Sequence, residues 1–318
     1  MILGASVAAH SGVLAHPPIV GRFAPSPSGP LHFGSLVAAA GSYLDAKSRG
    51  GRWLVRMEDL DPYRTLPGAA GEILRTLEAF GFAWDGPVVY QSQRSPAYRQ
   101  ALETLRSRAA IYPCGCSRKE IAELAVAGVG VGYVYPGTCR DGLPQGKSER
   151  ALRLRVADEV VGFDDNVQGR FRQNLAEQAG DFVVMRADGV FAYPLAVVVD
   201  DAAQGVTHVV RGADLLAATP RQIYLQKGLD LPTPAYAHLP VAVNEHGQKL
   251  GKQTRAAPLD PARPGEALFK ALVFLGQGPP AELFGADPGQ LWAWGLKRWR
   301  LAQVCRVVQM PCGQAAGW

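Results

Sequence analysis

The stretch Arg22-Phe-Ala-Pro-Ser-Pro-Ser-Gly-Pro-Leu-His-Phe-Gly-Ser35 decides the fold of this chain. It overlaps the apolar run Val20–Phe23, which predicts a strand, and it leads into a predicted helix over 34–47. A helix that starts at the carboxyl edge of a parallel sheet attracts phosphate. Gly34 would let a nucleotide approach the backbone, and His32 could donate a hydrogen bond to a phosphate oxygen. His-x-Gly alone is also typical of an ordinary surface loop.

Strand and helix patterns alternate on both sides of this stretch. Apolar residues recur at helical spacing from Ala69, and Gly81 ends that pattern. Such alternation is typical of a parallel sheet, so we expect a doubly wound, Rossmann-like α/β domain. The predicted strands are 20–23, 53–58, 195–199, 208–210 and 236–243, and the predicted helices are 34–47, 69–80, 95–110 and one from Pro220. Asp200 and Asp201 would end the strand 195–199 and approach the nucleotide.

The pattern changes near Tyr112. The following residues are rich in turns and cysteines, and Asp188-Gly189 between two apolar runs predicts a β-hairpin. We therefore expect an antiparallel α+β insertion into the α/β domain. The expected units are a disordered extension over 1–19, a Rossmann-like domain over 20–111 and 193–243, the insertion over 112–192, and a loop with a mainly helical C-terminal part over 244–318, with helices at 266–275 and 290–301.

Composition indicates a cytoplasmic protein without a membrane span. The 318 residues carry a net charge of +5, which permits a polyanionic partner without proving one. No apolar run approaches the ~20 residues that a membrane helix needs. The first 18 residues contain no Lys or Arg and so lack the positive start of a secretory signal. Five cysteines form an odd set, which in a cytoplasmic chain favours metal over disulfides.

A second charged motif, Lys249-Leu-Gly-Lys-Gln253, lies about 215 residues after the first. Lysines on a loop can follow the charge that develops on a transferring phosphoryl group. In this order the two motifs resemble the HIGH and KMSKS signatures of class I aminoacyl-tRNA synthetases. Residues 22–29, 56–61 and 209–214 (RFAPSPSG, RMEDLD and VVRGAD) resemble the glutamyl branch of that class. Gly251 stands where the family often has Ser, and its backbone N–H would have to replace that hydroxyl.

Within this branch the chain resembles the glutamyl-Q tRNA(Asp) synthetase family. The first signature ends in Ser35, and the segment 191–201 is similar to the core segment of that family. A full glutamyl-tRNA synthetase carries a further anticodon-binding domain, for which we expect no residues before position 318. The resemblance implies activation of L-glutamate with ATP and Mg²⁺ to glutamyl-adenylate without tRNA. It further implies transfer of glutamate to queuosine in the anticodon of tRNA(Asp).

A glutamate site needs two cations and one anion. Arg22 and Arg211 can bind the two carboxylates through charge-assisted hydrogen bonds, and Glu58 can hold the ammonium. Which arginine binds which carboxylate stays open, and each charge could instead form a structural ion pair. The resemblance assigns glutamate contacts to Arg22, Ser26, Glu58, Tyr193 and Arg211, ATP contacts to His32, Gly34, Ser35 and Lys252, and catalytic roles to His32, Lys249 and Lys252.

Three cysteines, Cys114, Cys116 and Cys139, lie within 26 residues, and thiolates suit zinc. Zinc prefers four ligands, but no histidine lies between residues 33 and 207. The family pattern supplies Tyr135 as the fourth ligand of a structural zinc ion. Because phenolate is an unusual zinc ligand, three free thiols remain the alternative.

Three other functions are compatible with these residues. The chain could be a truncated glutamyl-tRNA synthetase that charges the 3′ end of tRNA(Glu). It could join a small acid to an amine without RNA, although the two arginines beside Glu58 disfavour this. It could also be a non-catalytic, zinc-bearing tRNA-binding module, which His32, Lys249 and Lys252 disfavour.

Overall fold

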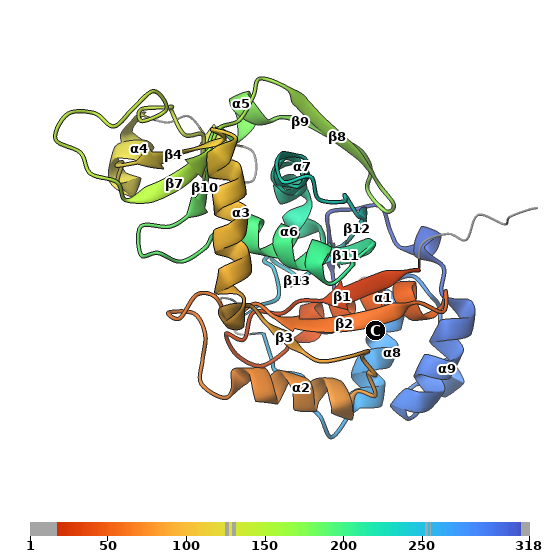
Figure 1. Cartoon of the computed structure of the whole chain (residues 1–318). Coiled ribbons are helices and arrows are strands. Elements are labelled where there is room, and N and C mark those ends of the chain that lie inside the picture. The colour runs from red at the N-terminus through yellow and green to blue at the C-terminus, as the bar shows by residue number, and fades with distance from the viewer. Residues whose placement is uncertain (1–17, 125–126, 129–131, 252–253, 255, 313–318) are drawn as a thin grey trace, which may run out of the picture.

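The computed structural model describes residues 18–124, 127–128, 132–251, 254 and 256–312 (Figure 1). Residues 1–17 of the expected extension and the candidate catalytic Lys252 lie outside these ranges. Ile19, which the interpretation placed in the extension, accepts a hydrogen bond from the N–H of Arg52. Within the described part of the chain, no helix combines the length and the apolar character that crossing a membrane requires.

Two groups of parallel strands form the centre of the molecule (Figure 1). The first has the order β1-β2-β3, and the second pairs β11 with β12. The groups meet where the N–H of Thr207 donates to the carbonyl of Val20 at 3.0 Å. The strands are β1 (Val20–Phe23), β2 (Arg52–Met57), β3 (Val89–Tyr90), β11 (His208–Gly212) and β12 (Ala235–Leu239). The parallel α/β centre expected from the sequence is confirmed.

Each face of this sheet has its own core, because successive side chains of β2 point to opposite faces. Trp53 and Val55 belong to the core on the side of α1, α2, α8 and α9, whereas Leu54 belongs to the core on the side of α3, α6 and α7. The helices are α1 (Phe33–Lys47), α2 (Ala69–Ala79), α3 (Ser95–Ser107), α6 (Tyr193–Ala203), α7 (Thr219–Gly228), α8 (Pro264–Phe274) and α9 (Pro288–Arg298). A sheet buried on both faces explains why the strands are almost continuously apolar.

The predicted strand at 195–199 is wrong, because these residues lie in helix α6. Leu195, Ala196, Val197 and Val198 are all buried. A helix that is apolar on all sides has no 3.6-residue pattern of apolar positions. Its sequence therefore looks the same as that of a short buried strand. Asp200 and Asp201 consequently lie near the end of a buried helix and not at the end of a strand.

The middle of the chain is antiparallel, as predicted. Strands β10, β7 and β4 form one sheet, and β8 pairs with β9 in a separate hairpin (Figure 1). The bounds here are β4 (Ile111–Cys114), α4 (Arg118–Leu124), β5 (Ala127–Gly128), β6 (Gly132–Tyr133), β7 (Ala151–Leu154), β8 (Val160–Asp165), β9 (Gly169–Asn174), α5 (Leu175–Gln178) and β10 (Phe182–Met185). The turn predicted at Asp188-Gly189 is present, because the N–H of Arg186 donates to the carbonyl of Val190. The second strand of the predicted hairpin is short: Phe191 forms an isolated bridge with Met185, and Tyr193 already begins α6.

The predicted strand 236–243 is divided in two. Pro240 has no N–H to donate to a ladder, and it separates β12 from β13. β13 (Val241–Val243) pairs in parallel with β14 (Gln309–Pro311), a C-terminal strand that the sequence did not predict. The predicted helices at 266–275 and 290–301 correspond to α8 and α9. Among the described residues, short 3₁₀ turns cover Gln91–Gln93, Ala213–Ala218, Ala281–Leu283 and Leu301–Gln303.

Candidate active site

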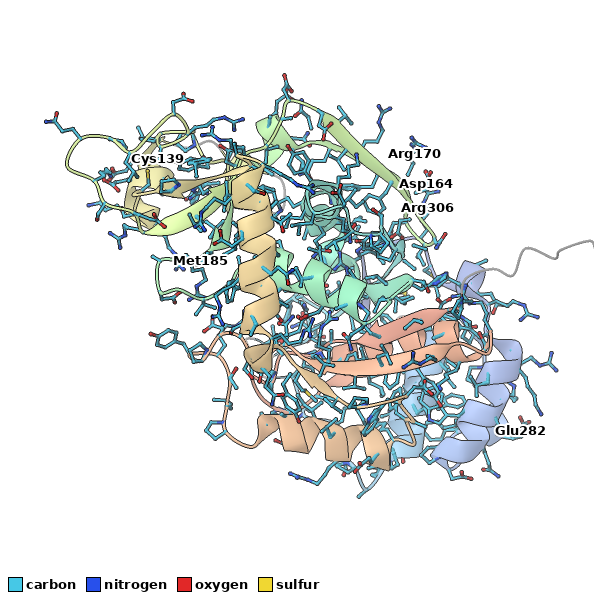
Figure 2. All side chains as sticks on the ribbon, in the orientation of Figure 1. Cys139, Asp164, Arg170, Met185, Glu282 and Arg306 are labelled. Carbon is cyan, nitrogen blue, oxygen red and sulfur yellow. The ribbon has the colours of Figure 1, made fainter. Side chains whose placement is uncertain are left out.

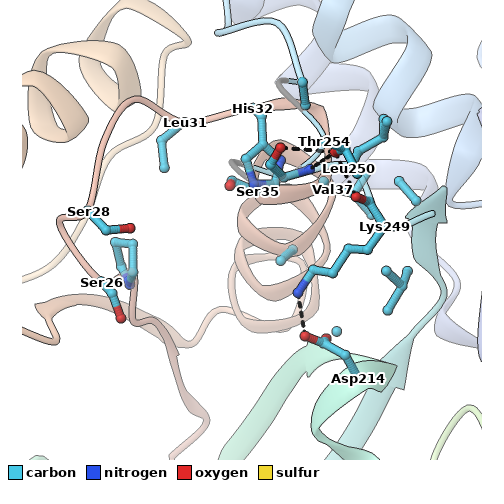
Figure 3. A pocket seen from close by; sticks show the side chains of 18 of the residues that line it. Ser26, Ser28, Leu31, His32, Ser35, Val37, Asp214, Lys249, Leu250 and Thr254 are labelled. Carbon is cyan, nitrogen blue, oxygen red and sulfur yellow. Dashed lines mark hydrogen bonds and ion pairs between the residues drawn. The ribbon is translucent and has the colours of Figure 1, made fainter. Parts of the chain in front are cut away.

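A cavity of about 910 Å³ opens where β1 ends and α1 begins (Figure 3). His32 immediately precedes α1, and Gly34 lies in its first turn. A Cβ added to Gly34 would lie 3.2 Å from Cε1 of His32 and 3.5 Å from the carbonyl oxygen of Leu250. A Cβ added to Gly251 would lie 3.8 Å from Nε2 of His32. The structure therefore brings the two motifs to one wall of this cavity, which Ser35 also lines.

The imidazole of His32 is only partly exposed to solvent. Its Nδ1 is buried and has no hydrogen-bond partner among the residues that the structure describes. Burial, and to a lesser extent the charge of Lys249, hold the pKa of His32 below its usual range. The ring is therefore neutral at pH 7, and it retains one N–H donor for a ligand in the cavity.

Thr254 holds the loop that carries the second motif. Its hydroxyl accepts a hydrogen bond from the N–H of Gly251 at 3.0 Å and lies 2.9 Å from the carbonyl oxygen of Lys249. The ammonium of Lys249 pairs with Asp214 at the cavity edge (Figure 3). Both side chains of this pair are more than a third exposed, so the pair contributes little to stability. Lys249 can therefore leave Asp214 and bind a ligand in the cavity.

A second cavity, of about 550 Å³, lies at the carboxyl ends of β1, β2 and β11. The five residues predicted to contact glutamate all line it, namely Arg22, Ser26, Glu58, Tyr193 and Arg211. Six residues line both cavities: Phe23, Ser26, Ala38, Arg64, Gly212 and Asp214. The two cavities thus share one wall, and a ligand in one can reach a ligand in the other.

A buried ion cluster supports the second cavity. Oδ1 of Asp201 accepts from Nε of Arg22 at 3.2 Å and from Nη1 of Arg56 at 2.7 Å. Nη2 of Arg56 lies 3.4 Å from Oε1 of Glu58. Sequence analysis missed the roles of Arg56 and Asp201, although both lie within segments quoted for the family resemblance. Asp200 points elsewhere and accepts hydrogen bonds from Tyr98, Gln91 and Arg94.

The charges in this cluster do not cancel. Three guanidiniums, Arg22, Arg56 and Arg211, lie near two carboxylates, Glu58 and Asp201. A third carboxylate, Asp200, also acts on Arg56, but its charge is balanced by its own ion pair with Arg94. Burial raises the pKa of Glu58, while Arg56 and Arg22 oppose this rise. The surplus of one positive charge favours an anionic ligand.

Arg211 is 5% exposed, and protein groups hold most of the donors of its guanidinium. Nη2 donates to Thr219 and Gln222, at 2.8 Å each, and Nε donates to Nε2 of His238 at 3.1 Å. Within the described residues, Nη1 has only a long contact of 3.4 Å to the hydroxyl of Tyr193. Nη1 is therefore the donor that Arg211 offers to a ligand.

A cysteine cluster lies in the inserted segment (Figure 2). The three Sγ atoms of Cys114, Cys116 and Cys139 lie within 4.8 Å of one another, and those of Cys116 and Cys139 are 3.6 Å apart. The hydroxyl of Tyr135 lies 3.4 Å from Sγ of Cys114 and 3.6 Å from Sγ of Cys116. The structure thus brings together the three predicted thiol ligands and Tyr135.

Arg153 lies against this cluster. Its Nε donates to Sγ of Cys114 at 3.2 Å, and its guanidinium lies 3.7 Å from the ring centroid of Tyr135. Burial raises the pKa of the Cys114 thiol, but hydrogen bonds with Tyr135 and Arg153 bring that pKa below its ordinary value. This environment favours the thiolate of Cys114, the form of cysteine that binds metals, whereas burial and the neighbouring thiols raise the pKa of Cys116.

Fold and site together define a class I tRNA synthetase catalytic domain. The family model described as tRNA synthetases class I (E and Q), catalytic domain, matches residues 18–279. A protein of Aromatoleum aromaticum and one of Dechloromonas aromatica, both named glutamyl-Q tRNA(Asp) synthetase, are 58% and 59% identical to this chain. The matches cover 93% and 91% of this chain and 93% and 96% of the relatives. The chain belongs to the glutamyl-Q tRNA(Asp) synthetase family within this class, and is an ATP-dependent ligase.

Solved structures share the fold. A glutamate-tRNA synthetase from Elizabethkingia anophelis superposes with a TM-score of 0.76 at 24% identity. The match covers 93% of this chain and 68% of that enzyme.

Proposed function

We propose that this chain activates L-glutamate with ATP and transfers it to queuosine in the anticodon of tRNA(Asp). The observation that carries this proposal is the shared wall of the two cavities, one with a helix start and a lysine loop, the other with paired arginines and a buried glutamate. Formation of an adenylate needs a phosphate site and a dicarboxylate site in contact with each other. The names of the two relatives support glutamate as the amino acid and tRNA(Asp) as the acceptor.

Charge and shape support glutamate in the smaller cavity. Free glutamate carries two carboxylates and one ammonium, so its net charge of about −1 matches the positive surplus of the cluster. Arg22 and Arg211 would bind the two carboxylates, and Glu58 would bind the ammonium. Ser26 and Tyr193 would add hydroxyl contacts. Arg56 and Asp201 would hold Arg22 and Glu58 in place without touching the substrate.

ATP with its Mg²⁺ would occupy the larger cavity, with Gly34 and Ser35 at the helix start next to the phosphates. The α-carboxylate of glutamate would attack the α-phosphate, forming the mixed anhydride while the bond to pyrophosphate breaks. His32, Lys249 and Lys252 would stabilise the charge of the pentavalent phosphate without forming a covalent intermediate. Lys249 would leave Asp214 and bind a phosphate, which the exposure of its ion pair with Asp214 allows.

Zinc fits the cysteine cluster. A tetrahedral ion with Zn–S bonds of about 2.3 Å holds its sulfur ligands about 3.8 Å apart. The separation of 3.6 Å between Cys116 and Cys139, and the contacts of the Tyr135 hydroxyl at 3.4 and 3.6 Å, lie close to such edges. The ion would be structural and would hold the proposed insertion over 112–192. A reducing cytoplasm, the location that we propose, keeps such thiols available for metal.

One labelling experiment tests the function. Radiolabelled glutamate and ATP are offered with tRNA(Asp) that carries queuosine, with tRNA(Asp) that lacks it, and with tRNA(Glu). We expect label on the first alone, and it should persist when the 3′-terminal adenosine is removed. Label on tRNA(Glu) alone would replace this proposal with a truncated glutamyl-tRNA synthetase. Pyrophosphate exchange measured without tRNA tests whether activation is independent of RNA.

A further inference from the structure

A fully buried histidine holds the side chain of Arg211. His238 lies in β12, directly opposite Arg211 in β11, and its exposed fraction is 0%. Nε of Arg211 lies 3.1 Å from Nε2 of His238. Arginine can only donate hydrogen bonds, so Nε2 of His238 must accept and carries no proton. The proton of the neutral ring is therefore on Nδ1.

Asp165 holds the other side of the same ring. Its Oδ2 lies 2.6 Å from Nδ1 of His238, which is the geometry of a donated N–H. Its Oδ1 accepts from three backbone N–H groups, those of Val167, Gln168 and His238, at 3.0, 2.8 and 3.0 Å. One carboxylate thus determines both the place and the tautomer of His238. The same arrangement orients histidines that bind metals, where a carboxylate selects which ring nitrogen is free.

Asp165 comes from the inserted segment, at the turn between β8 and β9. Nε2 of Gln168 donates to the carbonyls of His238 and Val307, and Nε of Arg306 donates to the carbonyl of Gln168. These bonds fasten the turn to β12 and to the C-terminal segment, so the carboxylate of Asp165 has little freedom to move.

We propose that Asp165 and His238 are positioning residues, which lock the guanidinium of Arg211 so that Nη1 alone meets a carboxylate of the substrate. This inference rests on the proposed function, because it takes glutamate as the occupant of the smaller cavity. Asp165 and Arg211 are the charged groups that contact the ring, with Thr219 beside Nε2 and the rings of Tyr236 and Phe163 packed near it. Neither positioning residue lines either cavity.

The substitution Asp165→Asn tests this lock without changing the shape of the side chain. Three backbone donors require an oxygen at the Oδ1 position, so the new NH₂ must occupy the Oδ2 position. That NH₂ donates to Nδ1 of His238 and moves the ring proton to Nε2. Two donors then face each other between His238 and Arg211, and Arg211 must turn away.

We expect Asp165→Asn to raise the KM for glutamate roughly 10- to 100-fold in pyrophosphate exchange, which is the scale of one charge-assisted hydrogen bond. The KM for ATP should stay unchanged. Asp181→Asn is the matched control, because Asp181 is equally buried in the inserted segment and accepts from Tyr112 and Val156, and none of the three lines the smaller cavity. The control should lower stability but leave the KM for glutamate unchanged.

Two substitutions of the histidine separate positioning from a merely structural role. His238→Gln places an acceptor near the Nε2 position and can still hold Arg211. His238→Asn retains only the bond toward Asp165. Positioning predicts that Asn raises the KM for glutamate more than Gln does. The opposite order would overturn the inference, because it would mean that only the anchor to Asp165 matters.

Nitrogen NMR of the histidine side chains gives a readout that needs no substrate. The wild-type enzyme should show His238 with the proton on Nδ1, and Asp165→Asn should show it on Nε2. A proton on Nε2 in the wild type would overturn the inference even if the enzyme activates glutamate. If His238 carries its proton on Nδ1 but no glutamate-dependent pyrophosphate exchange occurs, the proposed function fails. The positioning of Arg211 by His238 and Asp165 would then belong to a site for another ligand.

Discussion

Replacing Asp201 by Asn removes one charge from the buried cluster and leaves its shape in place. Both Arg22 and Arg56 donate to the same oxygen, Oδ1, and the amide oxygen of Asn can occupy that position. Side-chain exposure is 7% for Asp201, 4% for Arg22 and 0% for Arg56, so water cannot screen the lost charge. The positive surplus rises from one to two, with Glu58 left as the only carboxylate near both arginines.

Removing one partner of a buried pair costs about 3–5 kcal/mol, and the retained hydrogen bonds place this variant near the lower value. A loss of about 3 kcal/mol should lower the Tm by roughly 4–5 °C in a chain of 318 residues, because the entropy of unfolding is about 2.1 cal/mol/K per residue. Thermal unfolding at pH 7 measures this loss, with Asp230→Asn as the control. Asp230 pairs with Arg108 at the surface, where their side chains are 75% and 43% exposed, so water screens the pair and its loss should leave the Tm almost unchanged. Equal losses in the two variants would refute the buried cluster as the support of the smaller cavity.

Four further outcomes follow from the site. Lys252→Ala should cut glutamate-dependent pyrophosphate exchange by roughly 10²–10³-fold, and unchanged exchange would remove this lysine from the mechanism. Gly34→Ala should cut the same exchange roughly 10- to 100-fold with the fold intact by circular dichroism, because the new Cβ lies 3.2 Å from the ring of His32 and displaces it. The KM for glutamate should rise as the pH falls, because the ammonium of the substrate needs the ionised form of Glu58. Burial raises the pKa of Glu58, so the inflection should lie above the usual glutamate pKa of about 4.3, and an inflection at or below that value would count against the contact. Cys116→Ser should lower the zinc content of one ion per chain expected for the wild type, measured by elemental analysis, while exchange without tRNA continues; metal-free wild-type protein with an intact fold would contradict the zinc site.

Much of this site could be predicted from the sequence because its main parts are contiguous. His32 and Gly34 lie in one stretch with Arg22, and the turn chemistry of that stretch requires a strand before it and a helix after it. Glu58 follows β2 directly, and Arg211 lies near the end of β11. Side chains at the carboxyl ends of parallel strands meet at one edge of the sheet, so a correct strand pattern brings these residues together.

The parts that could not be predicted depend on contacts between distant segments. Asp201 lies 145 residues from Arg56, and Asp165 lies 73 residues from His238. A buried carboxylate or histidine has the same local pattern whether it supports a site or only fills a core. The error at 195–199 made this harder, because an Asp201 at the end of a strand would face the nucleotide edge, whereas the helix α6 turns it toward Arg22.

The turn of the β8–β9 hairpin changes how the inserted segment is understood. A division of the chain at residues 112 and 192 treats the insertion as a separate unit. Asp165 belongs to that unit by sequence, yet its carboxylate is buried against β12 and holds the ring that fixes Arg211. A displacement of the hairpin would therefore alter the guanidinium in the smaller cavity through two hydrogen bonds. If the smaller cavity binds glutamate as we propose, the insertion is part of the amino-acid site, because polar contacts cross the boundary between the two units.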